Sequence, residues 1–285
     1  MNAASSTPQA SPQQEVPLDS RFRFGRNWAK FLTLLDDNRI AIAEDSLKTW
    51  LGTESLAGKR FLDIGCGSGL FSLCARRLGA TVRSFDFDPD SVGCAMELRR
   101  RYFPDDKQWE IHQGSVLDED LISSLGQWDI VYSWGVLHHT GRMWEALGNA
   151  ERCVPQGGTL FIAIYNDQGG ASRRWTRVKR AYCAAPSFLK WIILLFYMIK
   201  LWGPTFFIGL LKGKPFDFWT KYRSARGMSP WHDLVDWVGG YPFEVAKPEE
   251  IFDFFRDRGF RLLQMKTCGG GLGCNEFVFR RELKS

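Results

Sequence analysis

Three glycines at alternate positions stand between an apolar run and a helical pattern, in the segment FLDIGCGSG at 61–69. Glycine tolerates positive φ and lets a ligand approach the backbone closely, and a helix that starts after such a turn presents free N–H groups. The third glycine comes one position earlier than in the G-x-G-x-x-G turn that holds a pyrophosphate, and Asp63 precedes the turn. A carboxylate there suits a cationic amino group better than a diphosphate.

Short apolar runs alternate with helical patterns on both sides of this turn. The patterns predict strands at 60–64, 81–85, 109–113, 128–133 and 159–165, and helices at 70–78, 91–102, 118–125 and 143–153. Alternation returns with a helix at 248–258 and strands at 261–267 and 277–281, which flank a glycine-rich turn. We therefore expect a doubly wound, mostly parallel α/β sheet closed by an antiparallel hairpin. Such sheets bind ligands beyond the carboxyl ends of their strands.

A second carboxylate follows the next expected strand. Asp86 lies 17 positions after Gly69 and suits the two hydroxyl groups of a ribose. After the third strand, Ser115 and a backbone N–H are expected at the edge of an adenine ring. Together these groups predict a ligand with an amino acid end, a ribose and an adenine.

These motifs resemble the class I S-adenosylmethionine-dependent methyltransferases. The resemblance runs from about Gly58 to Tyr165 and includes the terminal hairpin by pattern. It implies a Rossmann-like sheet of seven strands with an antiparallel last strand, and S-adenosyl-L-methionine as the cofactor. Ser115 stands where many members carry an aspartate. The cofactor-binding positions that it implies are Asp63, Gly65, Cys66, Gly67, Gly69, Asp86, Phe87, Ser115, Val116 and Trp134.

The order of segments is also loosely similar to the ubiquinone-biosynthesis O-methyltransferases, through a Leu-His-His segment, Asn166 and a later His-Asp segment. That group typically has Glu-His where this chain has His138-His139, so no metal site is expected. The (Asp/Asn)-Pro-Pro-(Tyr/Phe) motif of enzymes that methylate base amines is replaced by Ser-Trp-Gly-Val at 133–136. No cysteine follows a proline, which argues against a cytosine-C5 enzyme.

Four residues are candidates for a general base or for lining the acceptor site, because a hydroxyl acceptor must lose a proton. His138 and His139 follow the fourth strand at the ligand end of the sheet, and histidine titrates near neutrality. His232 and Asp233 are adjacent in an aromatic segment. Structural roles, in packing or helix capping, are the alternative for all four. His112 lies in a strand and is expected to pack.

Composition indicates the class of protein and separates the chain into segments. Its 285 residues, 45% hydrophobic and 24% charged, predict a globular protein of one or two domains. Seven cysteines without a C-x-x-C pair favour a reducing, cytoplasmic compartment. The Ser/Pro/Gln-rich residues 1–20 predict a disordered tail without a secretory signal. Residues 21–57 are expected to form a helical cover, and 58–285 the methyltransferase domain.

An insertion at about 166–247 interrupts the alternation. The run Arg173, Arg174, Arg177, Lys179 and Arg180 predicts a solvated helix, with an anionic partner as the alternative. The apolar segment 188–211 is interrupted by Lys200 and by Gly203-Pro204, which argues against a membrane-spanning helix. We expect either buried lid helices or a peripheral membrane contact through residues 188–212.

The sequence thus predicts an enzyme that transfers a methyl group to a small-molecule acceptor. The expected acceptor atom is an oxygen of an apolar, isoprenoid or glycan-linked compound, because tryptophans are frequent in the insertion. Two alternatives stay open: an RNA methyltransferase, although no RNA-binding module is recognisable, and a catalytically silent S-adenosylmethionine-binding protein. The oligomeric state is left open.

Overall fold

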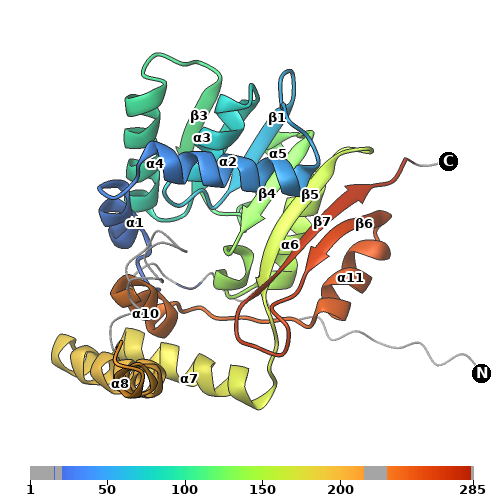
Figure 1. Cartoon of the computed structure of the whole chain (residues 1–285). Coiled ribbons are helices and arrows are strands. Elements are labelled where there is room, and N and C mark those ends of the chain that lie inside the picture. Colours follow the sequence, from blue (N-terminus) through green and yellow to red (C-terminus); the bar gives the residue numbers. More distant parts are fainter. Residues whose placement is uncertain (1–15, 17–20, 215–229, 284–285) are drawn as a thin grey trace, which may run out of the picture.

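The computed structural model describes residues 16, 21–214 and 230–283 of the chain. Its strands form one sheet in the order β3-β2-β1-β4-β5-β7-β6 (Figure 1). The strands are β1 (Arg60–Ile64), β2 (Thr81–Asp86), β3 (Trp109–Gln113), β4 (Ile130–Trp134), β5 (Thr159–Tyr165), β6 (Phe260–Lys266) and β7 (Cys274–Arg281). The first five run parallel to one another, and β7 is antiparallel to both β5 and β6. The predicted doubly wound sheet with a closing antiparallel hairpin is confirmed.

Helices cover both faces of the sheet (Figure 1). One face packs against α5 (Glu119–Leu125), α6 (Met143–Arg152) and α11 (Pro248–Arg256), and the other against α2 (Asp37–Leu51), α3 (Leu70–Arg77) and α4 (Pro89–Tyr102). Alternate residues of β1 serve the two faces, since Leu62 and Ile64 enter one core and Phe61 enters the other. This burial on both sides is why the strand sequences are apolar runs rather than alternating patterns.

The segment before β1 forms two helices that lie against the sheet layer. The first, α1 (Gly25–Leu32), packs on α4, and α2 packs on α3. The polar residues Asp36 to Asn38 predict a helix break there. The structure has the break slightly earlier, at 33–36, because the Asp36 side chain caps α2 by accepting from the Arg39 N–H. Gly52 ends α2 in the left-handed conformation. The predicted tail at 1–20 lies outside the described residues, apart from Val16.

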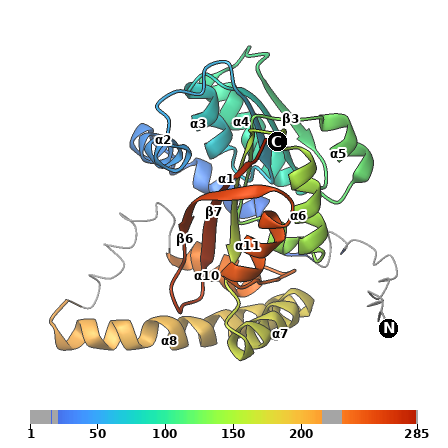
Figure 2. The same ribbon diagram turned by 90° about the vertical axis from the view of Figure 1, so that its right-hand side faces the viewer.

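The insertion forms a separate helical layer, made of α7 (Gly170–Ala184), α8 (Ser187–Leu211) and α10 (Pro230–Gly239). In both views α7 and α8 lie together at the end of the molecule farthest from α2 and α3 (Figure 2). The four arginines of the basic run are exposed, as predicted for a solvated helix, but Lys179 is fully buried. Its ammonium group donates to the Trp237 carbonyl and lies 4.6 Å from the Trp237 ring centroid, so α7 and α10 are joined.

The helix α8 differs from the sequence prediction. It continues through Gly203 and Pro204 for 25 residues, because an interior proline removes one backbone hydrogen bond without ending the helix. By length and composition α8 is long and apolar enough to cross a membrane. The prediction of buried lid helices is wrong for α8, because Leu194 is the only buried side chain in Ser187–Leu211.

Candidate active site

A cleft lies at the carboxyl ends of the parallel strands, where a doubly wound sheet binds its ligands. Four separate parts of the chain build its wall: the start of the described chain, the ends of β1 and β2, the loops after β3 and β4, and the segment after α10. The residues that line it are Arg21, Phe22, Phe24, Ile64, Gly65, Phe85, Asp86, Phe87, Asp88, Ser115, Val116, Val136, His139, Thr140, Tyr241 and Pro242. Six of these were predicted as site residues: Gly65, Asp86, Phe87, Ser115, Val116 and His139.

The glycine turn between β1 and α3 adopts a backbone that other residues rarely reach. Gly65, Gly67 and Gly69 have φ values of 74°, 54° and 81°. A β-carbon on Gly65 would lie 2.2 Å from a methyl group of Val136, and one on Gly69 would lie 2.9 Å from Ala95 Cα. A β-carbon on Gly67 would meet the Trp28 indole at 3.0 Å. The turn is therefore pressed between the post-β4 loop, α4 and the N-terminal cover, and only its Gly65 end reaches the cleft wall.

Asp86 ends β2 beside this turn. Its carboxylate accepts from the N–H of Gly67 at 2.9 Å and from the N–H of Asp88 at 2.9 Å, with one oxygen for each donor. Burial raises the pKa of Asp86 to about 6, although these backbone donors favour the ionised form. Each oxygen keeps a second lone pair, so the group can accept two hydroxyl hydrogens of a vicinal diol.

The Asp63 side chain lies behind the glycine turn, and not in the cleft wall as the sequence predicts. Its side chain is 2% exposed and accepts from the Ser72 hydroxyl on α3, behind the glycine turn. Burial raises the pKa of Asp63 to about 7. Asp63 is not among the residues of the cleft wall, so the predicted direct contact with a cofactor amino group stays a prediction. In the structure Asp63 joins the strand to the helix that follows the turn.

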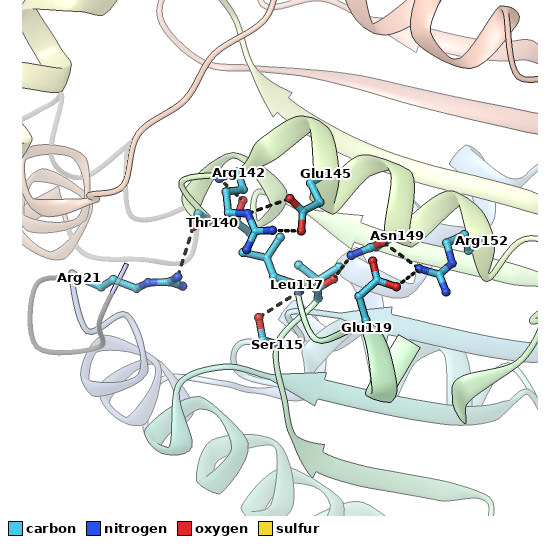
Figure 3. Close-up of polar contacts among 10 residues, drawn as sticks. Arg21, Ser115, Leu117, Glu119, Thr140, Arg142, Glu145, Asn149 and Arg152 are labelled. Atoms are coloured by element: carbon cyan, nitrogen blue, oxygen red, sulfur yellow. Dashed lines mark hydrogen bonds and ion pairs between the residues drawn. The ribbon is translucent and has the colours of Figure 1, made fainter. Parts of the chain in front are cut away.

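The loop after β3 supplies one edge of the cleft through Ser115 and Val116. The Ser115 hydroxyl accepts from the Leu117 N–H at 3.1 Å, and the Val116 carbonyl accepts from the Asn149 side chain at 2.9 Å (Figure 3). Figure 3 also shows Arg21 donating to the Thr140 carbonyl, at 3.3 Å. The bond from Asn149 joins the loop after β3 to α6.

The two adjacent histidines have different surroundings. His139 lines the cleft, and its Nδ1 lies 2.6 Å from the Pro242 carbonyl. A carbonyl can only accept, so Nδ1 carries the hydrogen and Nε2 keeps its lone pair. Burial lowers the pKa of His139 to about 3. His138 is fully buried, its Nδ1 accepts from the Tyr165 N–H at 3.2 Å, and burial lowers its pKa well below the usual value.

Other predicted residues lie away from the cleft wall. Cys66 is buried, and Trp134 is 44% exposed at the end of β4. His112 is exposed on the edge strand β3, 3.7 Å from Glu110, so the prediction that it packs in the core is wrong. His232 and Asp233 belong to α10, but their side chains are outside the described part of the chain. In that part, no group of three or more His, Cys, Asp or Glu side chains converges as metal ligands.

Sequence reasoning missed the cleft residues that precede α1 and those that follow α10. Arg21, Phe22 and Phe24 precede the first helix, and Tyr241 and Pro242 end the insertion. The alternating aromatic and basic residues at 21–24, directly after the polar tail, were the available signal. Nothing in the local sequence pairs this segment with residues more than 200 positions later.

The donors and acceptors of the cleft fit S-adenosyl-L-methionine. Asp86 offers two acceptor oxygens for the ribose hydroxyls, and Gly65 lines the same cleft. Ser115 and Val116 form an edge where an adenine can lie, with Phe85 and Ile64 as apolar neighbours in the same wall. The acidic surroundings suit a ligand that carries a positively charged sulfur.

Known proteins support this interpretation. The family described as "Methyltransferase domain" matches residues 35–193, more than half of the chain. A tRNA U34 carboxymethyltransferase of Pseudomonas aeruginosa is 34% identical over 119 residues, which is 41% of this chain and 35% of that protein. The protein of the same name in Pseudomonas savastanoi is 38% identical over 109 residues, or 38% and 33% of the two chains. The matches thus span about a third of these relatives.

Solved structures share the fold at low identity. Magnesium protoporphyrin IX methyltransferase from Synechocystis, with bound SAH, has a TM-score of 0.51 and 17% identity, covering 90% of this chain and 94% of that one. An O-methyltransferase family protein from Burkholderia thailandensis has a TM-score of 0.52 and 15% identity, covering 86% and 58%. The strand order, the glycine turn with Asp86, and the family match together lead to one assignment. The chain belongs to the methyltransferase-domain family, and its sheet has the fold of the class I methyltransferases.

Proposed function

We propose that the protein methylates an oxygen of an apolar small molecule, such as an isoprenoid or glycan-linked compound. The observation that carries this proposal is His139, whose free Nε2 belongs to a cleft wall rich in aromatic rings. The Phe24 and Tyr165 ring centroids lie 4.9 and 5.4 Å from that of His139. An apolar acceptor would lose water on this wall, and its hydroxyl would meet a hydrogen-bond acceptor there.

The cofactor supplies a methyl group bound to a positively charged sulfur. His139 would take the proton that the acceptor hydroxyl releases, with Pro242 holding the ring in the required tautomer. A pKa of about 3 keeps the imidazole neutral at physiological pH. The protonated ether formed when a neutral hydroxyl attacks is a much stronger acid than this imidazolium, so the proton transfer runs downhill.

Experiments can distinguish the proposed acceptor class from two alternatives. RNA is the acceptor class that the names of the curated relatives suggest. Trp175 lies within the basic helix α7, where an exposed ring could stack on a base. Against RNA, its ring packs between the rings of Tyr197 at 4.9 Å and Trp237 at 5.3 Å. A catalytically silent protein is the second alternative, and the presence of the glycine turn and Asp86 favours an active enzyme.

The seven unpaired cysteines fit a reducing, cytoplasmic location.

Labelled methyl transfer into fractionated lysate tests this function. We expect label in the organic-soluble fraction, and mass spectrometry of the product should give an O-methyl group. The variant His139→Gln should lower kcat by about 100-fold or more while leaving cofactor affinity unchanged. The variant His112→Gln, at an exposed site, is the matched control and should behave as wild type. Label in bulk tRNA, or cofactor binding without any transfer, would reject the proposed acceptor class.

A further inference from the structure

The helix α8 carries an apolar face that no described element covers. Phe188, Ile192, Leu195 and Ile199 follow one another every three or four residues and are 69%, 57%, 52% and 60% exposed. Leu210 continues the same line at 53%. Water-soluble monomers rarely expose an apolar surface of this extent unless it binds something.

The opposite side of α8 is held by the insertion itself. Leu194 is buried, and the Tyr197 ring lies tilted against Trp175 of α7 with ring centroids 4.9 Å apart. Trp191 stacks on Trp231 of α10 with ring centroids 5.5 Å apart. Between Trp191 and Tyr197 one side of α8 is therefore covered by α7 and α10, and lipid cannot surround this part of the helix. This part can contact a bilayer only lengthwise, through its exposed face.

Charge identifies the kind of surface that fits α8. Residues 170–214 contain nine Lys and Arg and no Asp or Glu, whereas the rest of the chain has a formal net charge of −4. The arginines at 173, 174, 177 and 180 are exposed, on the side of α7 opposite the buried Lys179 and Tyr182. They therefore lie on the side of α7 away from its contact with α10, and α7 and α8 lie together at one end of the molecule (Figure 2).

We propose that α7 and α8 dock the protein on a bilayer that contains anionic phospholipid. In this arrangement α8 lies in the membrane plane with its apolar face between the acyl chains and the headgroups. The α7 arginines and Lys200, Lys212 and Lys214 contact the lipid phosphates. The docking surface does not depend on which acceptor the enzyme methylates, so the two proposals fail separately.

Vesicle flotation of the full-length protein tests the docking. We expect flotation with phosphatidylcholine vesicles that contain phosphatidylglycerol, at least tenfold weaker binding to pure phosphatidylcholine, and release by high salt. The variant Ile199→Glu should weaken binding at least tenfold, because a carboxylate would enter the apolar boundary. The control is Ile42→Glu on α2, since Ile42 is also 60% exposed but lies at the other end of the molecule. Calorimetry with S-adenosylmethionine confirms that both variants are folded.

Four outcomes would overturn the docking. The first is that the intact chain does not float with anionic vesicles. The second is that Ile42→Glu and Ile199→Glu reduce flotation equally. A lipid-free dimer that Ile199→Glu dissociates would make a second copy the occupant of the apolar face. Protection of one end of the chain from protease added outside sealed vesicles would show that α8 crosses the bilayer. A loss of charge selectivity in the double variant Arg173→Glu and Arg177→Glu would support the docking.

Discussion

The Asp86 carboxylate is held between two backbone N–H groups at the wall of the cleft. Those donors fix the orientation of both oxygens, so the Asp86 side chain loses little conformational entropy when a diol binds there. Burial disfavours the ionised carboxylate and raises the pKa of Asp86 to about 6. The affinity for the cofactor should therefore depend on pH through the protonation of Asp86.

We expect Asp86→Ala to weaken S-adenosylmethionine binding about 100-fold or more, because two hydrogen bonds to a charged group are lost. The control is Asp118→Ala. Asp118 caps α5 by accepting from the N–H groups of Asp120 and Leu121, so its loss should cost about 1 kcal/mol of stability and little affinity. Calorimetric titration measures both, and equal losses of affinity would contradict the ribose assignment of Asp86.

Cofactor affinity should also fall at acidic pH. The ionised form of Asp86 accepts two hydroxyl hydrogens, whereas the protonated form loses an acceptor. Since its pKa is about 6, affinity should be constant well above that pH and fall roughly tenfold per unit below it. Titrations at several pH values check this. Asp86→Asn should lack the fall and Asp63→Asn should retain it; a pH-independent wild type would sink the assignment.

At the scale of elements, the turn between β1 and α3 depends on its neighbours as much as on its own glycines. Gly65 and Val136 belong to different loops, yet a β-carbon on Gly65 would overlap the Val136 side chain. The turn and the post-β4 loop therefore form one packed unit that holds the cleft open.

We expect Gly65→Ala to reduce the melting temperature by more than Gly135→Ala. Both residues have positive φ, 74° and 75°, but a β-carbon on Gly135 meets nothing within 4 Å. Gly135→Ala should cost only the conformational strain, about 1–2 kcal/mol, whereas Gly65→Ala adds the overlap. Adding Val136→Ala to Gly65→Ala should recover part of the loss in calorimetry. Equal effects of the two single variants would show that Val136 moves aside freely.

The elements of the sheet could be predicted because each has a local cause. Apolar runs gave the strands, Asp36 marked the break before α2, and the glycines marked the turn after β1. The continuity of α8 could not be predicted, since Lys200, Gly203 and Pro204 are ordinary helix-ending signals and α8 is apolar on several sides. The burial of Lys179 was also hidden, because its partner carbonyl belongs to Trp237, 58 positions away.

At the scale of the whole molecule, the cleft joins the segment before α1 to the segment after α10. Gly25 N–H donates to Asp88 at 3.0 Å, and Asn27 on α1 is hydrogen bonded to Asp236 on α10 at 2.5 Å. The N-terminal cover, the sheet and the insertion therefore meet around one site. This part of the site could not be read from the sequence, because the contacts join segments that share no pattern.

Cofactor binding should consequently slow amide exchange in three separate parts of the chain. We expect protection at 21–28, at 65–69 with 86–88, and at 239–243, measured by hydrogen exchange with mass spectrometry. The strand β6, at the far edge of the sheet, serves as the internal control and should not change. Protection confined to residues 63–116 would mean that the cover and the insertion do not close on the cofactor.

The same layer that carries α8 also ends at Tyr241 and Pro242, which line the cleft. An enzyme resting on α8 would meet its acceptor by lateral diffusion, with a search in two dimensions replacing one in three. Turnover would then follow the number of acceptor molecules per unit of membrane area. Diluting a fixed amount of acceptor with inert lipid would slow the reaction, although nothing in the surrounding solution had changed.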